Sequence, residues 1–97
     1  MSAMEIVNYQ LNDGVDSDAF LAICRTVGEE FTRQRPGFID REIGRNDDGT
    51  WLIAVHWNTA DDAHNSISSI DTVPDVVKTY MGMMNRDTLK RWVFDIV

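Results

Sequence analysis

The stretch from residue 51 to residue 57 constrains the fold of this chain more than any other part of the sequence. Its odd positions are all apolar and its even positions are mostly so, in the order Trp51, Leu52, Ile53, Ala54, Val55, His56 and Trp57. Successive side chains of a β-strand point to opposite faces, so both faces of the sheet that holds this strand must be covered. One layer of helices covers one face. We expect a second copy of the chain to cover the other, which predicts a homodimer joined through the sheet face that the helices leave open.

Three further strands follow from alternating apolar positions and from the turn residues between them. The four predicted strands are residues 5–11, 38–45, 51–57 and 89–97. In the first strand, Val7, Tyr9 and Leu11 share one face, and the opposite face carries Asn8. The second and third strands are joined by a hairpin turn at residues 46–49, where Gly49 suits a positive φ.

Helical spacing of apolar residues predicts three helical segments. The first spans residues 17–34, begins at Asp16 or Ser17 and is stopped by Pro36 and Gly37. The second begins at residues 59–62 with Thr59 as its N-cap. Its apolar stripe is Ala60, Ala63, Ile67 and Ile70. Residues 71–72 interrupt, and a third helix carries residues 73–84 with Pro74 in its first turn.

The predicted order is β-α-β-β-α-β, which is the ferredoxin-like arrangement of the α+β class. We expect a four-stranded antiparallel sheet in one domain formed by residues 1–97. The first and third strands are expected at its centre, parallel to each other, with the second and fourth strands at its edges.

Composition excludes several classes of partner. The 97 residues carry 16 acidic and nine basic side chains, a formal net charge of -7, which repels phosphate backbones, so no nucleic acid is expected. No apolar run approaches the ~20 residues of a membrane span, and the N-terminal residues lack the pattern of a signal peptide, so we expect a cytoplasmic protein. Cys24 is the single cysteine, and the two histidines have no ligand spacing. Neither a metal nor a cofactor is predicted.

Three short segments resemble a known family. They are Pro36-Gly37-Phe38, Asp48-Gly49-Thr50-Trp51, and Val55-His56-Trp57 followed by Thr59-Ala60-Asp61-Asp62-Ala63. In these segments and in its element order, the chain resembles the dimeric α/β-barrel superfamily, and within it the antibiotic-biosynthesis-monooxygenase (ABM) type of domain. The resemblance implies two four-stranded sheets that meet in a barrel, helices outside, and one cavity per subunit between sheet and helices.

The chemistry that the resemblance implies ranges from cofactor-independent oxygenation of aromatic polyketides to haem degradation and small-molecule isomerisation or cyclisation. Trp57 matches a pocket tryptophan of the oxygenase and haem-degrading branches. In the oxygenases an Asn precedes this Trp by four residues and a Tyr follows it by six, but here those positions hold Ile53 and Ala63. Asn8 and Trp57 match the haem-degrading branch, but residues 74–84 contain no histidine. We therefore expect no haem.

Three polar or aromatic residues are candidates for the chemistry, each with an ordinary structural alternative. Trp57 would stack on a flat substrate, or it fills the core at a strand end. Asn8 would orient a ligand from a strand, or it faces solvent or the barrel. His64 would act as an acid or base, or it is a half-exposed helix residue. His64 and Asn8 are the candidate catalytic residues.

A second group is expected to form a wall of the binding site. Tyr80, Met81 and Met84 share a helical stripe, which lines a cavity or packs in the core. With Trp57, they are the candidate substrate-binding residues. Cys24 lies in the apolar stripe of the first helix and is expected to be buried and inert, and His56 is expected to face the barrel or the other subunit.

The sequence leaves three functions open. The first is a cofactor-independent oxygenase or related enzyme that acts on a small apolar or aromatic compound. The second is a binding module with the same pocket and no catalysis, and the third is a structural dimeric domain whose cavity is filled by its own side chains. For the first two, the predicted site lies between the sheet and the helices, bordered by Trp57, Asn8, His64 and Tyr80.

Overall fold

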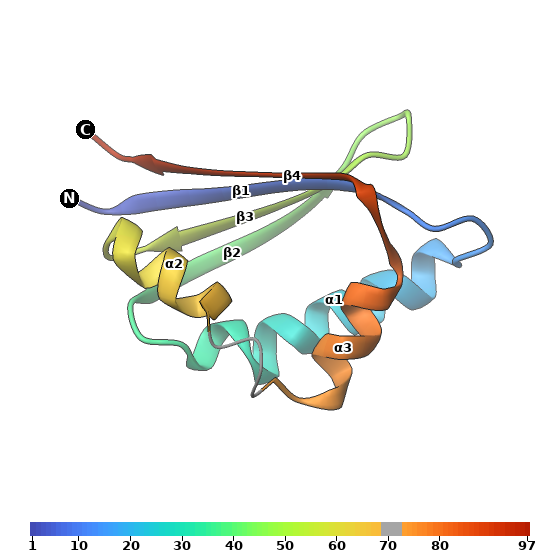
Figure 1. Ribbon diagram of the computed structural model, residues 1–97, viewed down its shortest axis with the longest axis horizontal. Helices are drawn as coiled ribbons and strands as arrows, with labels where there is room; N and C mark the ends of the chain where they lie inside the picture. Colours follow the sequence, from blue (N-terminus) through green and yellow to red (C-terminus); the bar gives the residue numbers. More distant parts are fainter. Residues whose placement is uncertain (69–72) are drawn as a thin grey trace.

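The computed structural model describes residues 1–68 and 73–97 and has the predicted α+β architecture (Figure 1). In chain order its elements are β1 (Ala3–Leu11), α1 (Ser17–Glu30), the 3-10 helix η1 (Thr32–Gln34), β2 (Phe38–Arg45), β3 (Trp51–Trp57), α2 (Ala60–Ser68), α3 (Asp75–Gly82) and β4 (Met84–Asp95). The predicted helical residue Ile70 and the interruption at 71–72 lie outside the described residues.

The four strands form one sheet in the order β2-β3-β1-β4, and every neighbouring pair is antiparallel. The central position of β1 and β3 is confirmed. Their predicted parallel direction is wrong, because Ala3 pairs with Trp57 and Tyr9 with Trp51 in an antiparallel register. Helix α1 returns the chain so that β2 runs in the direction of β1, and the hairpin after β2 then reverses the direction of β3.

Local interactions fix the ends of these elements. The Asp16 carboxylate accepts a hydrogen bond from the Ala19 N–H at 2.8 Å and so caps α1, and the Thr59 hydroxyl accepts one from the Asp62 N–H at 3.1 Å at the start of α2. Helix α1 ends at Glu30, earlier than predicted, and the chain tightens into η1 before Pro36. Gly37 then turns the chain into β2 with a φ of +84°.

Strand β4 begins at Met84, five residues before the predicted start at Leu89. Gln10 and Leu11 of β1 pair with Asn85 and Met84, and the register shifts between Asn8 and Gln10. This irregularity interrupts the alternation of side chains in β4, which explains why the sequence pattern located only the later part of the strand.

All three α-helices lie on one side of the sheet (Figure 1). The core lies between them and the sheet. It contains the odd positions of β3 and the helical residues Phe20, Cys24, Val27, Ala63, Val77 and Tyr80. On the opposite face, no helix of residues 1–68 or 73–97 covers Leu52, Ala54 and His56. The two-sided pattern of β3 thus corresponds to one face under helices and one open face.

The two ends of the chain lie next to each other at one end of the sheet (Figure 1). Ala3 pairs with both Trp57 and Asp95, and the Ile96 N–H donates to the Ser2 carbonyl at 2.9 Å. In the part of the chain that the structure describes, no helix is long and apolar enough to cross a membrane.

Candidate functional site

A cavity of about 200 Å³ lies between the sheet and the helices. Its apolar wall comes from α1, β3, α3 and β4, and includes Val27, Ile53, Val77, Met81 and Met84. Its charged lining residues are Glu5, Arg41 and Arg91. A pocket of this kind, mostly apolar with a few polar groups, is the usual form of a small-molecule site.

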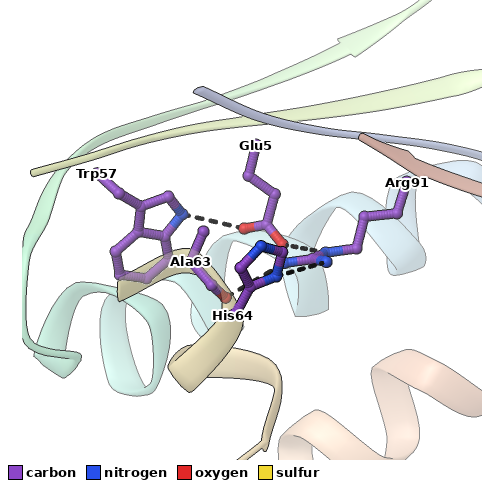
Figure 2. Close-up of polar contacts among 5 residues, drawn as sticks. All are labelled: Glu5, Trp57, Ala63, His64 and Arg91. Atoms are coloured by element: carbon purple, nitrogen blue, oxygen red, sulfur yellow. Dashed lines mark hydrogen bonds and ion pairs between the residues drawn. The ribbon is translucent and has the colours of Figure 1, made fainter. Parts of the chain in front are cut away.

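The main polar feature of the wall is a buried ion pair (Figure 2). Glu5, a residue of β1, is only 5% exposed. It accepts a hydrogen bond from the Trp57 indole N–H at 3.0 Å and one from the Arg91 Nε–H at 2.7 Å. Arg91 Nη2 also donates to the Ala63 carbonyl at 3.3 Å. These three hydrogen bonds hold the two charges in one geometry.

Trp57 is completely buried and does not belong to the cavity lining. Its ring packs edge-on against Phe38, with centroids 6.0 Å apart, and its N–H is used by Glu5. In this structure Trp57 thus orients the Glu5 carboxylate and has no open ring face on which a ligand could stack.

Tyr80, Met81 and Met84 all line the cavity, but the predicted helical stripe is wrong for Met84, because α3 ends at Gly82 and Met84 begins β4. The Tyr80 hydroxyl lies 3.1 Å from the Tyr9 hydroxyl, and Phe20 stacks on the Tyr80 ring with a centroid distance of 5.5 Å. Burial raises the pKa of both Tyr9 and Tyr80 far above the ordinary tyrosine value. Both phenols are therefore neutral at physiological pH.

His64 lies outside this lining, on the exposed side of Arg91. Its Nδ1 is 3.5 Å from Arg91 Nη1, and Figure 2 shows the imidazole beside the guanidinium. His64 is thus brought next to the ion pair from the rim, as expected for a helix residue that follows the buried Ala63.

The predicted placement of Asn8 at this site is wrong, because Asn8 points to the open face of the sheet. Its cross-strand neighbours are Leu52 and Lys90, and its amide donates to the Trp51 carbonyl at 3.4 Å. It lines a different hollow, of about 460 Å³, beside Thr88 and Trp92. Side chains alternate along a strand, so with Glu5, Val7 and Tyr9 under the helices Asn8 must face the other way.

The sequence pattern did not identify Glu5, Arg41 and Arg91 as residues of the site. A signal for two of them was present, because Glu5 shares the apolar face of β1 with Val7 and Tyr9, and Arg91 shares a face of β4 with Leu89 and Val93. A charged group on an apolar strand face requires a partner. That the two are partners depends on the pairing of β1 with β4, which connects residues 86 positions apart.

Two other residues lie as expected. Cys24 is fully buried in the core, and His56 is on the open face with its Nδ1 3.8 Å from Asp40 Oδ2. Within residues 1–68 and 73–97, no three side chains of His, Cys, Asp or Glu come together as a metal-binding group.

The fold that carries this site is similar to that of solved structures of the ABM type, which confirms the resemblance for the fold. The cofactor-independent oxygenase SnoaB from Streptomyces nogalater, in its N63A mutant, superimposes with a TM-score of 0.76 at 11% identity, covering 98% of this chain and 92% of that one. A protein provisionally named antibiotic biosynthesis monooxygenase from Bordetella bronchiseptica gives a TM-score of 0.77 at 17% identity, covering 99% and 97%.

A similarly named protein from Nitrosomonas europaea gives a TM-score of 0.73 at 18% identity, covering 96% of this chain and 88% of that one. No family model and no curated protein matches the sequence. At these identities the likeness concerns the fold, and the chemistry must be argued from the site.

Proposed function

We propose that this protein is a cofactor-independent enzyme of the oxygenase type, which acts on a small aromatic compound bound between the sheet and the helices. The observation that carries the proposal is the Glu5–Arg91 pair in the wall of a mostly apolar cavity. SnoaB, which has the same fold, is a cofactor-independent oxygenase. A buried ion pair is a weak source of stability compared with apolar packing, so its presence in a cavity wall favours a functional role.

The pair supplies what oxygenation of a phenol-like compound requires. A ring hydroxyl that faces Glu5 gives up its proton to the carboxylate, and Arg91 stabilises the anion that forms. The electron-rich anion forms a bond from a ring carbon to molecular oxygen, and Glu5 returns its proton to give a hydroperoxide. The O–O bond then breaks as the same carbon loses its hydrogen, so one oxygen atom stays in the ring as a carbonyl and the other leaves as water. Tyr80, Met81 and Met84 hold the ring, and His64 exchanges protons with solvent at the rim.

The volume of the cavity limits the size of the ligand. An apolar cavity of ~150 Å³ is large enough for benzene, and pockets for drug-sized ligands begin at ~300 Å³. The cavity here, at about 200 Å³, lies between them. It therefore suits compounds of one or two rings better than the larger fused-ring polyketides.

Non-catalytic binding of the same class of compound is the second candidate. It is favoured by the hydrogen bonds already made around the cavity. Both Glu5 oxygens accept protein donors, and the Tyr80 hydroxyl is paired with Tyr9. Each of these groups would have to exchange a partner before it could react with a ligand.

Oxygen uptake separates the two candidates. The purified protein is mixed with a panel of one- and two-ring quinols and phenols, with an anthrone as the larger reference. For the enzyme we expect uptake that is reduced at least ~100-fold in Glu5→Gln and Arg91→Gln, because each removes one member of the charge pair. Asn8→Ala, on the opposite face, should retain the rate. Ligand binding without uptake would favour the second candidate.

We also propose that the active form is a homodimer that covers the open face of the sheet. Trp92 and Phe94 are 41% and 53% exposed, large values for aromatic side chains. They neighbour Ile6 and Met4 of β1, which gives a contiguous apolar surface. A second copy would cover this apolar surface.

A further inference from the structure

One arginine of the edge strand β2 differs from the other charged residues around the cavity. Arg41 pairs with Val55 of β3, so its side chain points to the helix side of the sheet. Its Nη1 donates to the Cys24 carbonyl at 2.9 Å, and its Nη2 lies 3.5 Å from the Cys24 sulfur. The guanidinium is therefore held against helix α1.

A glycine in α1 makes this position possible. A Cβ atom placed on Gly28 would lie 2.5 Å from Arg41 Nη1 and 3.4 Å from its Cδ. No side chain larger than hydrogen fits there unless the arginine moves. Because glycine weakens a helix by ~1 kcal/mol relative to alanine, the close approach of Arg41 has a cost in stability.

Among the residues that the structure describes, the charge of Arg41 has no anionic partner. Within residues 1–68 and 73–97, the ion pairs within 4.0 Å are Arg91–Glu5 and His56–Asp40. A half-buried cation without a counter-charge is unfavourable, and a guanidinium has five N–H donors, of which the Cys24 contacts use two. Since Glu5 and Arg91 cancel, Arg41 leaves the cavity wall with one net positive charge.

Arg41 also lines a second hollow, which opens to solvent between α1 and β2. This groove, of about 540 Å³, carries Arg25 and Arg33 as well, against Glu29 and Asp40. In a chain with a formal charge of -7, a locally basic groove is unusual. The charge of Arg41 is also felt inside, because it opposes the effect of burial on the pKa of Tyr80.

We infer that Arg41 recognises a carboxylate, and that the ligand of the cavity is a one- or two-ring aromatic acid. This inference rests on the proposed function, to which it adds the charge of the ligand. A carboxylate matches the fork of a guanidinium and is ionised at neutral pH, whereas the ring fits the apolar part of the cavity. The basic groove on the outer side of Arg41 attracts such an anion from solution.

The test compares 2-naphthoate with its neutral, similarly shaped amide, 2-naphthamide, by isothermal titration calorimetry. The wild-type protein should bind the acid ~10- to 100-fold more tightly, the range expected for hydrogen bonds between charged groups. Arg41→Gln should lose this preference and keep its affinity for the amide, which also shows that the variant is folded. Arg41→Lys, which keeps the charge but not the fork, should retain part of the preference.

Two further variants locate the ligand. Val77→Phe fills the cavity and should abolish binding of both compounds, since Val77 is a buried residue of its wall. Arg25→Gln removes a charge from the outer groove only and should leave the preference for the acid in place.

The outcomes separate this inference from the proposed function. Equal affinity of the wild-type protein for acid and amide, or a preference that survives in Arg41→Gln, overturns the role of Arg41 and leaves the cavity as a site. A preference lost in Arg25→Gln and unaffected by Val77→Phe places the anion in the groove and also overturns it. If the wild-type protein binds neither compound, the inference is overturned, and the oxygen-uptake assay decides separately whether the proposed function fails.

Discussion

The two faces of the sheet differ in how far their side chains are buried. On the face under the helices, the one acidic side chain of β1 is paired with Arg91 and with the Trp57 indole, and the surrounding residues are apolar. On the open face, Trp92 and Phe94 remain partly exposed, and the charged residues Asp40, Glu42 and Lys90 lie opposite His56, Ala54 and Asn8. The side chains of the first face are buried within one chain. The second face exposes large apolar side chains, as protein-interaction surfaces do.

Two tryptophans, one on each face, give the largest contrast. Trp57→Ala should lower the free energy of unfolding by about 3–5 kcal/mol, because a fully buried aromatic side chain and its hydrogen bond are lost. The loss, measured by urea denaturation, should not depend on protein concentration. Trp92→Ala should cost little in dilute protein and more as the concentration rises, since only the dimer buries Trp92. Equal, concentration-independent losses for both would contradict the difference between the faces.

The next largest loss of stability is expected for substitutions in the Glu5–Arg91 ion pair. Glu5→Gln should destabilise the protein by about 2–3 kcal/mol, less than the ~3–5 kcal/mol for breaking a fully buried pair, because Arg91 keeps some contact with water. The double variant Glu5→Leu and Arg91→Leu should recover most of this loss and have no oxygen uptake. Chemical denaturation and the uptake assay together separate the stability of the pair from its chemistry. A double variant less stable than Glu5→Gln would mean that the pair is chiefly structural.

A charge on the open face should break the dimer without unfolding the chain. Phe94→Glu is expected to shift the sedimentation coefficient to that of a monomer at tens of micromolar, with the far-UV circular dichroism unchanged. Lys78→Gln, an exposed substitution on α3 with the same change in net charge, is the matched control and should remain dimeric. A wild-type protein that is already monomeric at this concentration would contradict the proposed dimer.

The smallest effect is a dependence on alkaline pH that belongs to the covered face. Both tyrosines of the chain lie there, and their folded-state pKa values are raised by burial. Above about pH 10 the unfolded chain releases tyrosine protons that the folded chain retains, so stability falls as pH rises. We expect a loss of about 1 kcal/mol per tyrosine between pH 10 and 11. Tyr80→Phe should lose less stability over this interval than the wild type; an unchanged slope would contradict the assignment.

The same two faces explain how much of the fold and of the site could be predicted from the sequence. The period-two pattern of β3 located a sheet with two apolar faces, and turn residues placed the hairpin and most element ends. Strand parity separated Asn8 from Tyr9, but it does not say which set lies under the helices, because both sets are partly apolar. Asn8 was therefore assigned to the wrong face.

The Glu5–Arg91 ion pair could not be predicted from the sequence, for a different reason. Glu5 and Arg91 each interrupt an apolar strand face, but their contact depends on the register between the first and last strands. That register is set by packing over the whole sheet and by the irregularity between Asn8 and Gln10, not by the residues on either side of Glu5 or Arg91.

The neighbouring chain ends have a consequence for engineering. A short linker from residue 96 to residue 2 would convert β4 and β1 into a hairpin, and new ends could be opened in the exposed turn at residues 46–49. The permuted chain would keep every strand pair of the sheet. Its most distant pairing, between β1 and β4, would become local, while that of β2 with β3 would become distant. Because local pairings close with less loss of chain entropy, comparing the refolding rates of the two chains would reveal which edge of the sheet forms first.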